Sequence, residues 1–218
     1  MNNQIKILVA GSILLIIGFL IFSNWGEPKS QLEKTNVDEV KTEDFASILG
    51  TTWQNNKADA TSSEISFDIE GLKDTKGFFK HFDVIFKVSD NNPEEAKLKV
   101  SINVNSINTD NDSRDEELKS DEWFETEKYP AIEFYSKGIK KIEGKYFTKG
   151  LLNMMGESKE LSFTFEHKGI TNNSDNKKVA IFEGAFEIDR TNFGMDHVAT
   201  VGDVVAINFY CELEEKRK

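Results

Sequence analysis

The chain has 218 residues, with 27 Lys and Arg against 38 Asp and Glu, three His, one Cys and 17 Phe. This length predicts one globular domain plus a targeting segment, and the net charge of −11 argues against a protein that binds nucleic-acid phosphates. A single Cys excludes an intramolecular disulfide, and three dispersed His without an H-x-x-x-H pair give no support for a metal site.

Residues 1–26 have the pattern of a targeting segment. Lys6 precedes the uncharged apolar run 7–22, which is typical of an export signal. The uncharged stretch continues to Trp25 and is long enough to cross a bilayer as a helix, with Trp25 at the interface. No small-x-small cleavage site follows, so we favour an uncleaved anchor at residues 7–25 over a cleaved signal peptide. Either reading places the rest of the chain in the periplasm or cell envelope.

Residues 27–50 are polar and lack apolar periodicity in their first half, so we expect a linker there and a folded domain at 51–218. The chain stays acidic once residues 1–26 are removed. We therefore expect the domain itself to repel anionic headgroups, with membrane contact made through the anchor.

Apolar and polar residues alternate with a period of two from Glu64 onward, which is typical of strands in a sheet with one wet face. We expect about eight such strands. They lie at 64–70, 82–88, 97–105, 132–134, 148–154, 161–165, 182–188 and 205–213, with short connections such as 138–144 and 172–176.

These strands can pack as a sandwich or close into a barrel. Even alternation and sequential hairpins favour an up-and-down antiparallel barrel, whose closure removes exposed sheet edges. The interior of an eight-stranded barrel can be filled by side chains or can hold one small ligand. The alternation does not distinguish the two.

One long connection, 109–129, interrupts the strands. Ser113 followed by Glu116 has the spacing of a capping box, so a short helix is predicted there. Trp123 and Phe124 are expected to hold this loop across one end of the barrel.

No strong catalytic motif is present, and we expect a protein that is not an enzyme. Asp115 and Glu116 could act as an acid–base pair only in a cleft, whereas the sequence places them on a solvated helix among lysines, which favours a structural role. Arg190 could bind an anionic head group, or it could satisfy loop carbonyls or a carboxylate at a strand end. Cys211 shares the parity of Phe209 and is expected to face inward as a small apolar residue.

Six sequence blocks in order carry a resemblance to a known family. They are SINT at 106–109, RDEELKS at 114–120, WF at 123–124 leading to KYPAIEF at 128–134, GLLNMMGESK at 150–159, RTNFG at 190–194 and VGDVV at 201–205. Over roughly residues 53–214 the chain resembles the YceI-like, or polyisoprenoid-binding, family of exported bacterial proteins. Gly71 and Asn153 depart from the family pattern, which usually has His and Thr there, so a head-group role for that His is lost.

The resemblance implies a lipocalin-like eight-stranded antiparallel barrel whose apolar interior holds a long isoprenoid lipid or isoprenoid quinone, with no other cofactor. The implied ligand-binding residues share the inward parity of their strands, except for Arg190 at the head group. They are Phe67, Ile69, Phe82, Val84, Phe86, Val100, Ile102, Ile132, Phe134, Leu152, Phe163, Phe165, Phe182, Phe186, Arg190, Ile207 and Phe209.

Two functions remain open from the sequence. The first is an exported, membrane-tethered protein that carries or stores an isoprenoid lipid without catalysis. The second is a filled barrel that acts as a protein-interaction or stress-response module through its acidic surface and the loop 109–129. A homodimer is compatible with either function.

Overall fold

The computed structural model describes residues 28–35, 48–57, 61–71, 74–173 and 175–216. The expected targeting segment and much of the expected linker lie outside these residues. No helix within the described ranges is long and apolar enough to cross a membrane. Ile48, in the expected linker, is fully buried in the domain core.

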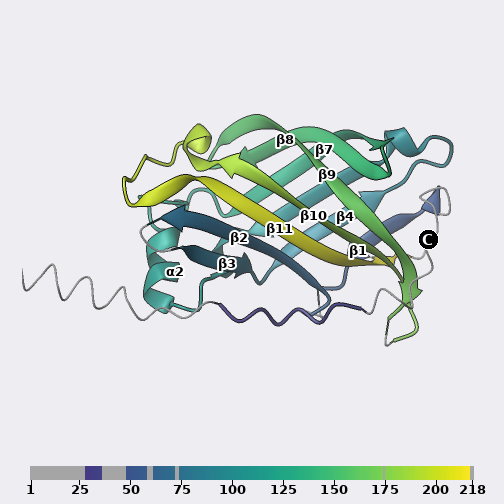
Figure 1. Ribbon diagram of the computed structural model, residues 1–218, viewed down its shortest axis with the longest axis horizontal. Coiled ribbons are helices and arrows are strands. Elements are labelled where there is room, and N and C mark those ends of the chain that lie inside the picture. Colours follow the sequence, from purple (N-terminus) through teal and green to yellow (C-terminus); the bar gives the residue numbers. More distant parts are fainter. Residues whose placement is uncertain (1–27, 36–47, 58–60, 72–73, 174, 217–218) are drawn as a thin grey trace, which may run out of the picture.

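Eight antiparallel strands close into a barrel, as predicted (Figure 1). Each strand pairs with the next one around the ring, and the last pairs back to the first. In ring order they are β1 (Thr52–Asn55), β4 (Phe82–Lys87), β5 (Lys97–Asn103), β7 (Ala131–Ile142), β8 (Lys145–Met154), β9 (Glu157–Asn172), β10 (Lys178–Asp189) and β11 (Val201–Glu215).

Three further strands extend this ring. β2 (Ser63–Gly71) pairs with β11, β3 (Thr75–Phe79) pairs with β2, and β6 (Ile107–Asn108) pairs with β3. The same edge of β11 pairs with β2 along 201–211 and with β1 along 213–215. The sequence therefore predicts the right number of barrel strands but includes β2 and omits β1, because four residues are too few to display an alternation.

The predicted connection 138–144 is mostly strand. A register shift between Ser136 and Gly138 reverses the parity of β7, so the apolar pattern looks broken while the strand continues. The turn itself contains Glu143 and Gly144, both with positive φ (50° and 85°), as tight hairpin turns require.

The helix predicted in the long connection is present as α2 (Asp112–Lys119), at one end of the barrel (Figure 1). Its N-cap is Asn111 and not Ser113, because the Asn111 side chain accepts a hydrogen bond from the backbone N–H of Arg114 at 3.0 Å. Asn is as good a cap as Ser, and here it lies at the chain reversal that precedes the helix.

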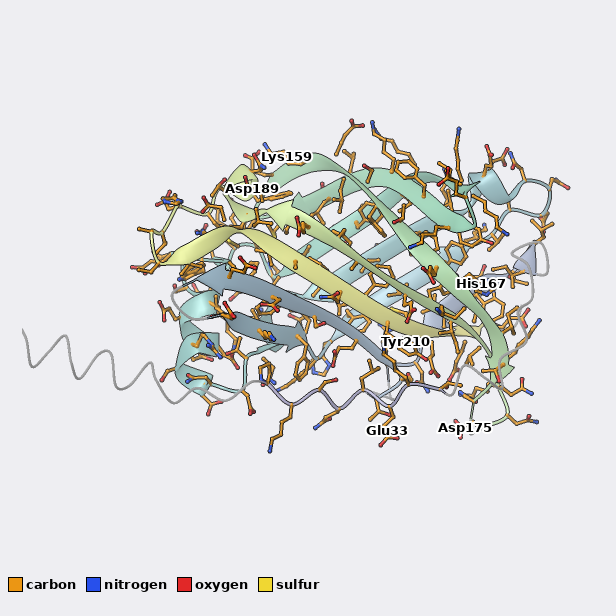
Figure 2. All side chains as sticks on the ribbon, in the orientation of Figure 1. Glu33, Lys159, His167, Asp175, Asp189 and Tyr210 are labelled. Carbon is orange, nitrogen blue, oxygen red and sulfur yellow. The ribbon has the colours of Figure 1, made fainter. Side chains whose placement is uncertain are left out.

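Residues 28–35, here called the strap, run along the outer surface of the barrel (Figure 1). The backbone N–H of Thr35 donates to Glu212 Oε1 at 3.0 Å and to the Tyr210 hydroxyl at 3.2 Å. Figure 2 shows Tyr210 on the side of the barrel where the strap carries Glu33. This part of the expected linker is therefore packed against the domain.

Candidate functional site

An apolar cavity of about 110 Å³ lies inside the barrel. Most of the residues that are expected to bind a ligand meet here, because the inward parity of β4, β5 and β7 to β11 points to the same space. Of the expected set, the cavity is lined by Val84, Phe86, Val100, Ile102, Ile132, Phe134, Leu152, Phe163, Phe165, Phe182, Phe186, Ile207 and Phe209.

Further side chains line this cavity, although they are not among the expected ligand-binding residues. They are Ile65, Leu98, Leu161, Cys211 and Leu213. Their strands had been recognised, and each shares the inward parity of its strand, so the alternation itself could have found them. Cys211 is buried, as predicted, and burial raises the pKa of its thiol to about 12.

The remaining expected residues lie elsewhere. Phe67 packs against Phe79 with ring centroids 5.7 Å apart, and Ile69 is buried on the same strand, β2, which extends beyond the eight-stranded ring. Phe82 lines a separate hollow. Arg190 lies at the end of β10, outside the cavity lining.

Phe163 lies at the centre of the aromatic packing inside the barrel. Its ring stacks on Phe186 with centroids 4.6 Å apart, and the centroids of Phe134 and Phe209 lie 5.3 and 6.0 Å away. These rings occupy most of the interior, which leaves a cavity smaller than the roughly 300–1,000 Å³ of typical ligand pockets.

A polar hollow of about 580 Å³ opens in the wall beside this cavity. It lies between the end of β1, the start of β2 and the neighbouring ends of β4 and β5, and it shares Ile102 with the cavity. Its lining is Asn55, Asn56, Lys57, Ser63, Lys80, His81, Phe82, Asp83, Ser101, Ile102, Asn103, Asn105, Pro130 and Ala131.

Asn55 stabilises the rim of the polar hollow. Its side-chain amide donates to the carbonyl of Phe82 at 2.9 Å and accepts from the backbone N–H of Val84 at 2.7 Å. These side-chain bonds replace the backbone hydrogen bonds that β1 would form with β4 if it continued past Asn55. They hold the two strands together at the edge of the hollow, where β1 ends.

Arg190 is almost fully buried, and its guanidinium bonds within the protein. Nε donates to the carbonyl of Gly202 at 2.9 Å, Nη1 to that of Asp196 at 2.6 Å, and Nη2 to Asp203 Oδ1 at 3.1 Å. The guanidinium carbon lies 5.3 Å from the ring centroid of Trp123, so Arg190 also joins the long connection to the strand ends. These contacts match the structural interpretation of Arg190.

Asp115 is buried, in contrast to the solvated position expected for it. Its Oδ1 accepts hydrogen bonds from the backbone N–H of Thr109 at 2.9 Å and from the Thr109 hydroxyl at 2.5 Å. Arg114 Nε donates to the same hydroxyl at 2.8 Å, so the group fixes the start of the loop. Within the described part of the chain, no cluster of three or more His, Cys, Asp or Glu is arranged to hold a metal ion.

Solved proteins share the fold of this barrel. A YceI protein of Campylobacter jejuni is 30% identical, with a TM-score of 0.59 over 68% of this chain and 87% of that chain. A polyisoprenoid binding domain from Saccharophagus degradans, at 14% identity and a TM-score of 0.53 over 78% of this chain and 99% of its own, shares the fold.

Curated proteins match over the same region. Protein YceI of Salmonella agona is 29% identical over 69% of this chain and 83% of its own length. A UPF0312 protein of Staphylococcus aureus is 32% identical over 63% and 80%, and one of Photorhabdus laumondii is 39% identical over 43% of this chain and about half of its own length (48%). The family model described as YceI-like domain matches residues 57–213. The chain therefore belongs to the YceI-like domain family.

Proposed function

We propose that this barrel binds the hydrocarbon chain of an isoprenoid or a similar amphiphilic lipid, and that it is a binding protein without catalysis. The observation that carries the proposal is the interior cavity, whose lining is apolar throughout. Transfer of an alkenyl chain from water into such a lining contributes about 25 cal/mol per Å² of buried apolar surface. The Saccharophagus domain, which is described as polyisoprenoid-binding, has the same fold and supports the choice of ligand.

The polar hollow is the place that we propose for the head of the amphiphile. Ile102 belongs to both linings, so the hollow lies next to the cavity, on either side of this residue. There, the exposed side chains of Lys80 and His81 can donate hydrogen bonds and lie among several amide side chains. Phosphate, hydroxyl and quinone oxygens all accept hydrogen bonds from such groups.

The small volume of the cavity sets a condition on binding. A long chain fits only if aromatic side chains move apart, because about 110 Å³ is less than typical ligand pockets provide. Six lining residues are only partly buried, and three of them, Phe186, Ile207 and Phe209, lie on the neighbouring strands β10 and β11; the others are Leu98, Val100 and Leu161. We propose that the cavity widens on this side, along β10 and β11.

The cellular setting belongs to the same proposal. An uncleaved anchor at residues 7–25, outside the described residues, would hold the barrel at the periplasmic or cell-envelope side of a membrane. A lipid carrier, a lipid store or a protein that protects against stress would each benefit from this position.

A second candidate function is a filled barrel that serves as a protein-interaction module. The observation that favours it is the same small cavity volume, since a barrel of this kind needs no ligand. The two candidates differ in whether lipid binds in stoichiometric amounts.

The test is native mass spectrometry of the full-length protein, followed by solvent extraction and identification of what is released. Lipid binding predicts one isoprenoid per chain, or uptake of added geranylgeraniol with a higher melting temperature. Ile102→Phe should block this uptake, whereas Ile107→Phe, an equal enlargement at a buried site outside the cavity, should not. A lipid-free mass without uptake by the wild type would contradict lipid binding and favour the interaction module.

A further inference from the structure

The charged residues of the barrel are segregated between two opposite walls. The first wall consists of β4, β5, β7 and β8, here called the basic wall, and carries eight lysines and two carboxylates. The lysines are Lys87, Lys97, Lys99, Lys137, Lys140, Lys141, Lys145 and Lys149, and the carboxylates are Asp83 and Glu133.

The second wall, here called the acidic wall, consists of β10, β11 and β2 and has ten carboxylates and one lysine. β9 and β1 separate the two walls on either side of the ring. In Figure 1 the acidic wall crosses the near side of the barrel. Its carboxylates are Glu64, Asp68, Glu70, Glu183, Glu187, Asp189, Asp203, Glu212, Glu214 and Glu215, and its lysine is Lys178.

The basic wall also carries a row of exposed apolar side chains. Ile85, Tyr135 and Leu151 are 42%, 38% and 37% exposed. Ile85 and Tyr135 both pair with Lys99 on the strand between them, and Tyr135 pairs with Leu151 on its other side. The ammonium of Lys99 lies 5.1 Å from the ring centroid of Tyr135. One rung of the sheet thus combines apolar contact with positive charge.

Neighbouring carboxylates reduce the positive charge of this wall but do not cancel it. On β9, Glu160 pairs with Lys137 at 2.8 Å and with Lys149 at 2.9 Å. The lysine side chains in these pairs remain more than half exposed, and β9 adds three carboxylates together with two lysines of its own. The basic wall therefore stays net positive on a chain whose net charge is −11.

We propose that the basic wall docks on an anionic lipid bilayer, with Ile85, Tyr135 and Leu151 at the level of the headgroups. Each lysine near an anionic surface contributes about 1 kcal/mol, and tyrosine favours the membrane interface. The acidic wall does not prevent docking, because electrostatic interactions in water are screened over about 8 Å at physiological salt. The apolar row favours a lipid surface over a soluble polyanion, which offers no apolar phase.

Docking through the basic wall does not require a lipid inside the barrel. It also determines where the polar hollow lies relative to the bilayer. Asp83 and Ser101, which line the hollow, come from β4 and β5 of the basic wall. Docking through this wall brings the hollow to the bilayer surface, where an amphiphile would enter or leave.

The test places one reporter on each wall of the full-length protein in vesicles. Leu151→Cys and Ala185→Cys, both at exposed positions, are labelled with bimane, while buried Cys211 stays unlabelled. We expect a blue shift at position 151 in phosphatidylglycerol vesicles, its loss in phosphatidylcholine vesicles or high salt, and no shift at position 185. Equal responses at the two positions, or none at position 151, would overturn the proposal. Ile85→Cys replaces Leu151→Cys if that variant does not fold.

Charge reversal then tests the role of the lysines. Lys99→Glu with Lys149→Glu should remove most of the shift, whereas Lys178→Glu on the acidic wall should leave it unchanged. All variants share the same N-terminal segment, so the difference reports on the barrel surface alone. The same blue shift with dextran sulfate in the absence of lipid would identify a soluble polyanion as the partner and would show that the lipid proposal is wrong.

Discussion

The ring of Phe163 stacks on that of Phe186 at a centroid distance of 4.6 Å and an interplanar angle of 21°. Phe163 comes from β9 and Phe186 from β10, and the contact lies inside the barrel, where both side chains line the cavity. Because the ring of Phe163 also packs against rings from β7 and β11, this one side chain limits how much space the interior offers.

Phe163→Ala is expected to enlarge the cavity at a cost in stability. Loss of a buried phenylalanine ring lowers the free energy of unfolding by about 3–5 kcal/mol. If the barrel binds isoprenoids, added geranylgeraniol should restore more stability to this variant than it adds to the wild type, as measured by urea unfolding. Phe193→Ala is the control, since Phe193 is buried outside the cavity. Equal recovery in both variants would count against binding in the cavity.

Asn55→Ala is expected to destabilise the contact between the end of β1 and β4 at the rim of the polar hollow. It leaves the Val84 N–H and the Phe82 carbonyl without their side-chain partner, which costs about 1–3 kcal/mol for buried groups. Amide hydrogen exchange at Val84 should rise along with the loss in unfolding free energy. Gln54→Ala, at the exposed neighbour, should change neither quantity.

Arg190→Lys separates the two roles considered for this arginine. A lysine ammonium cannot reproduce the planar fork that binds the carbonyls of Gly202 and Asp196 together with Asp203. We expect a loss of about 1.5–3 kcal/mol in urea unfolding, with lipid content unchanged in the folded fraction. Asn192→Ala, exposed in the same turn, is the control. Unchanged stability together with weaker lipid binding would instead assign Arg190 to a head group.

Stability is expected to fall at alkaline pH because of Cys211. The folded thiol has a pKa raised to about 12 by burial, whereas an unfolded thiol ionises near pH 8.5. The buried, uncharged thiol therefore contributes to the free energy of unfolding in full below about pH 8.5. This contribution is lost as the pH rises toward 12, by up to about 1.4 kcal/mol per pH unit.

Urea unfolding at about pH 8 and about pH 10 measures this loss. Cys211→Ala should show a smaller decrease between the two values than the wild type. Tyr210, whose pKa is raised by burial and by its hydrogen bond to Glu212, adds a loss in the same direction that both proteins share. If the unfolding free energy of the wild type falls no more steeply with pH than that of Cys211→Ala, Cys211 is not the cause of the loss. Rapid alkylation of the native thiol by iodoacetamide at about pH 8 would likewise contradict a buried thiol with a raised pKa.

The fold could be predicted wherever a strand was long enough to display its two faces. Lys97–Asn103 alternates without interruption and forms β5 as expected. β1 was missed because it has only four residues, and β7 was cut short because the shift at Ser136 reverses its parity. The count of barrel strands was right because β2, a strand of the extension, took the place of β1.

The site could be predicted to the same extent, and for the same reason. Inward parity identified most of the cavity lining, yet it also selected Phe67 and Ile69, since parity does not tell how far along β2 the cavity extends. The volume left between the aromatic rings depends on rotamers and could not be read from the sequence. The net charge is a sum over the chain, so it does not show how lysines and carboxylates are distributed between the two walls.

The pairing of β1 with the end of β11 joins residues 53–55 to residues 213–215. A chain made from its N-terminus onward cannot complete the ring until residues 213–215 are available, so closure is the most non-local pairing in the barrel. Until then one edge of β1 has no partner strand, and other chains can pair with it. Loss of residues 213–215 would therefore leave the ring unclosed at β1 and expose the edge of that strand to self-association, although the other strand pairings are retained.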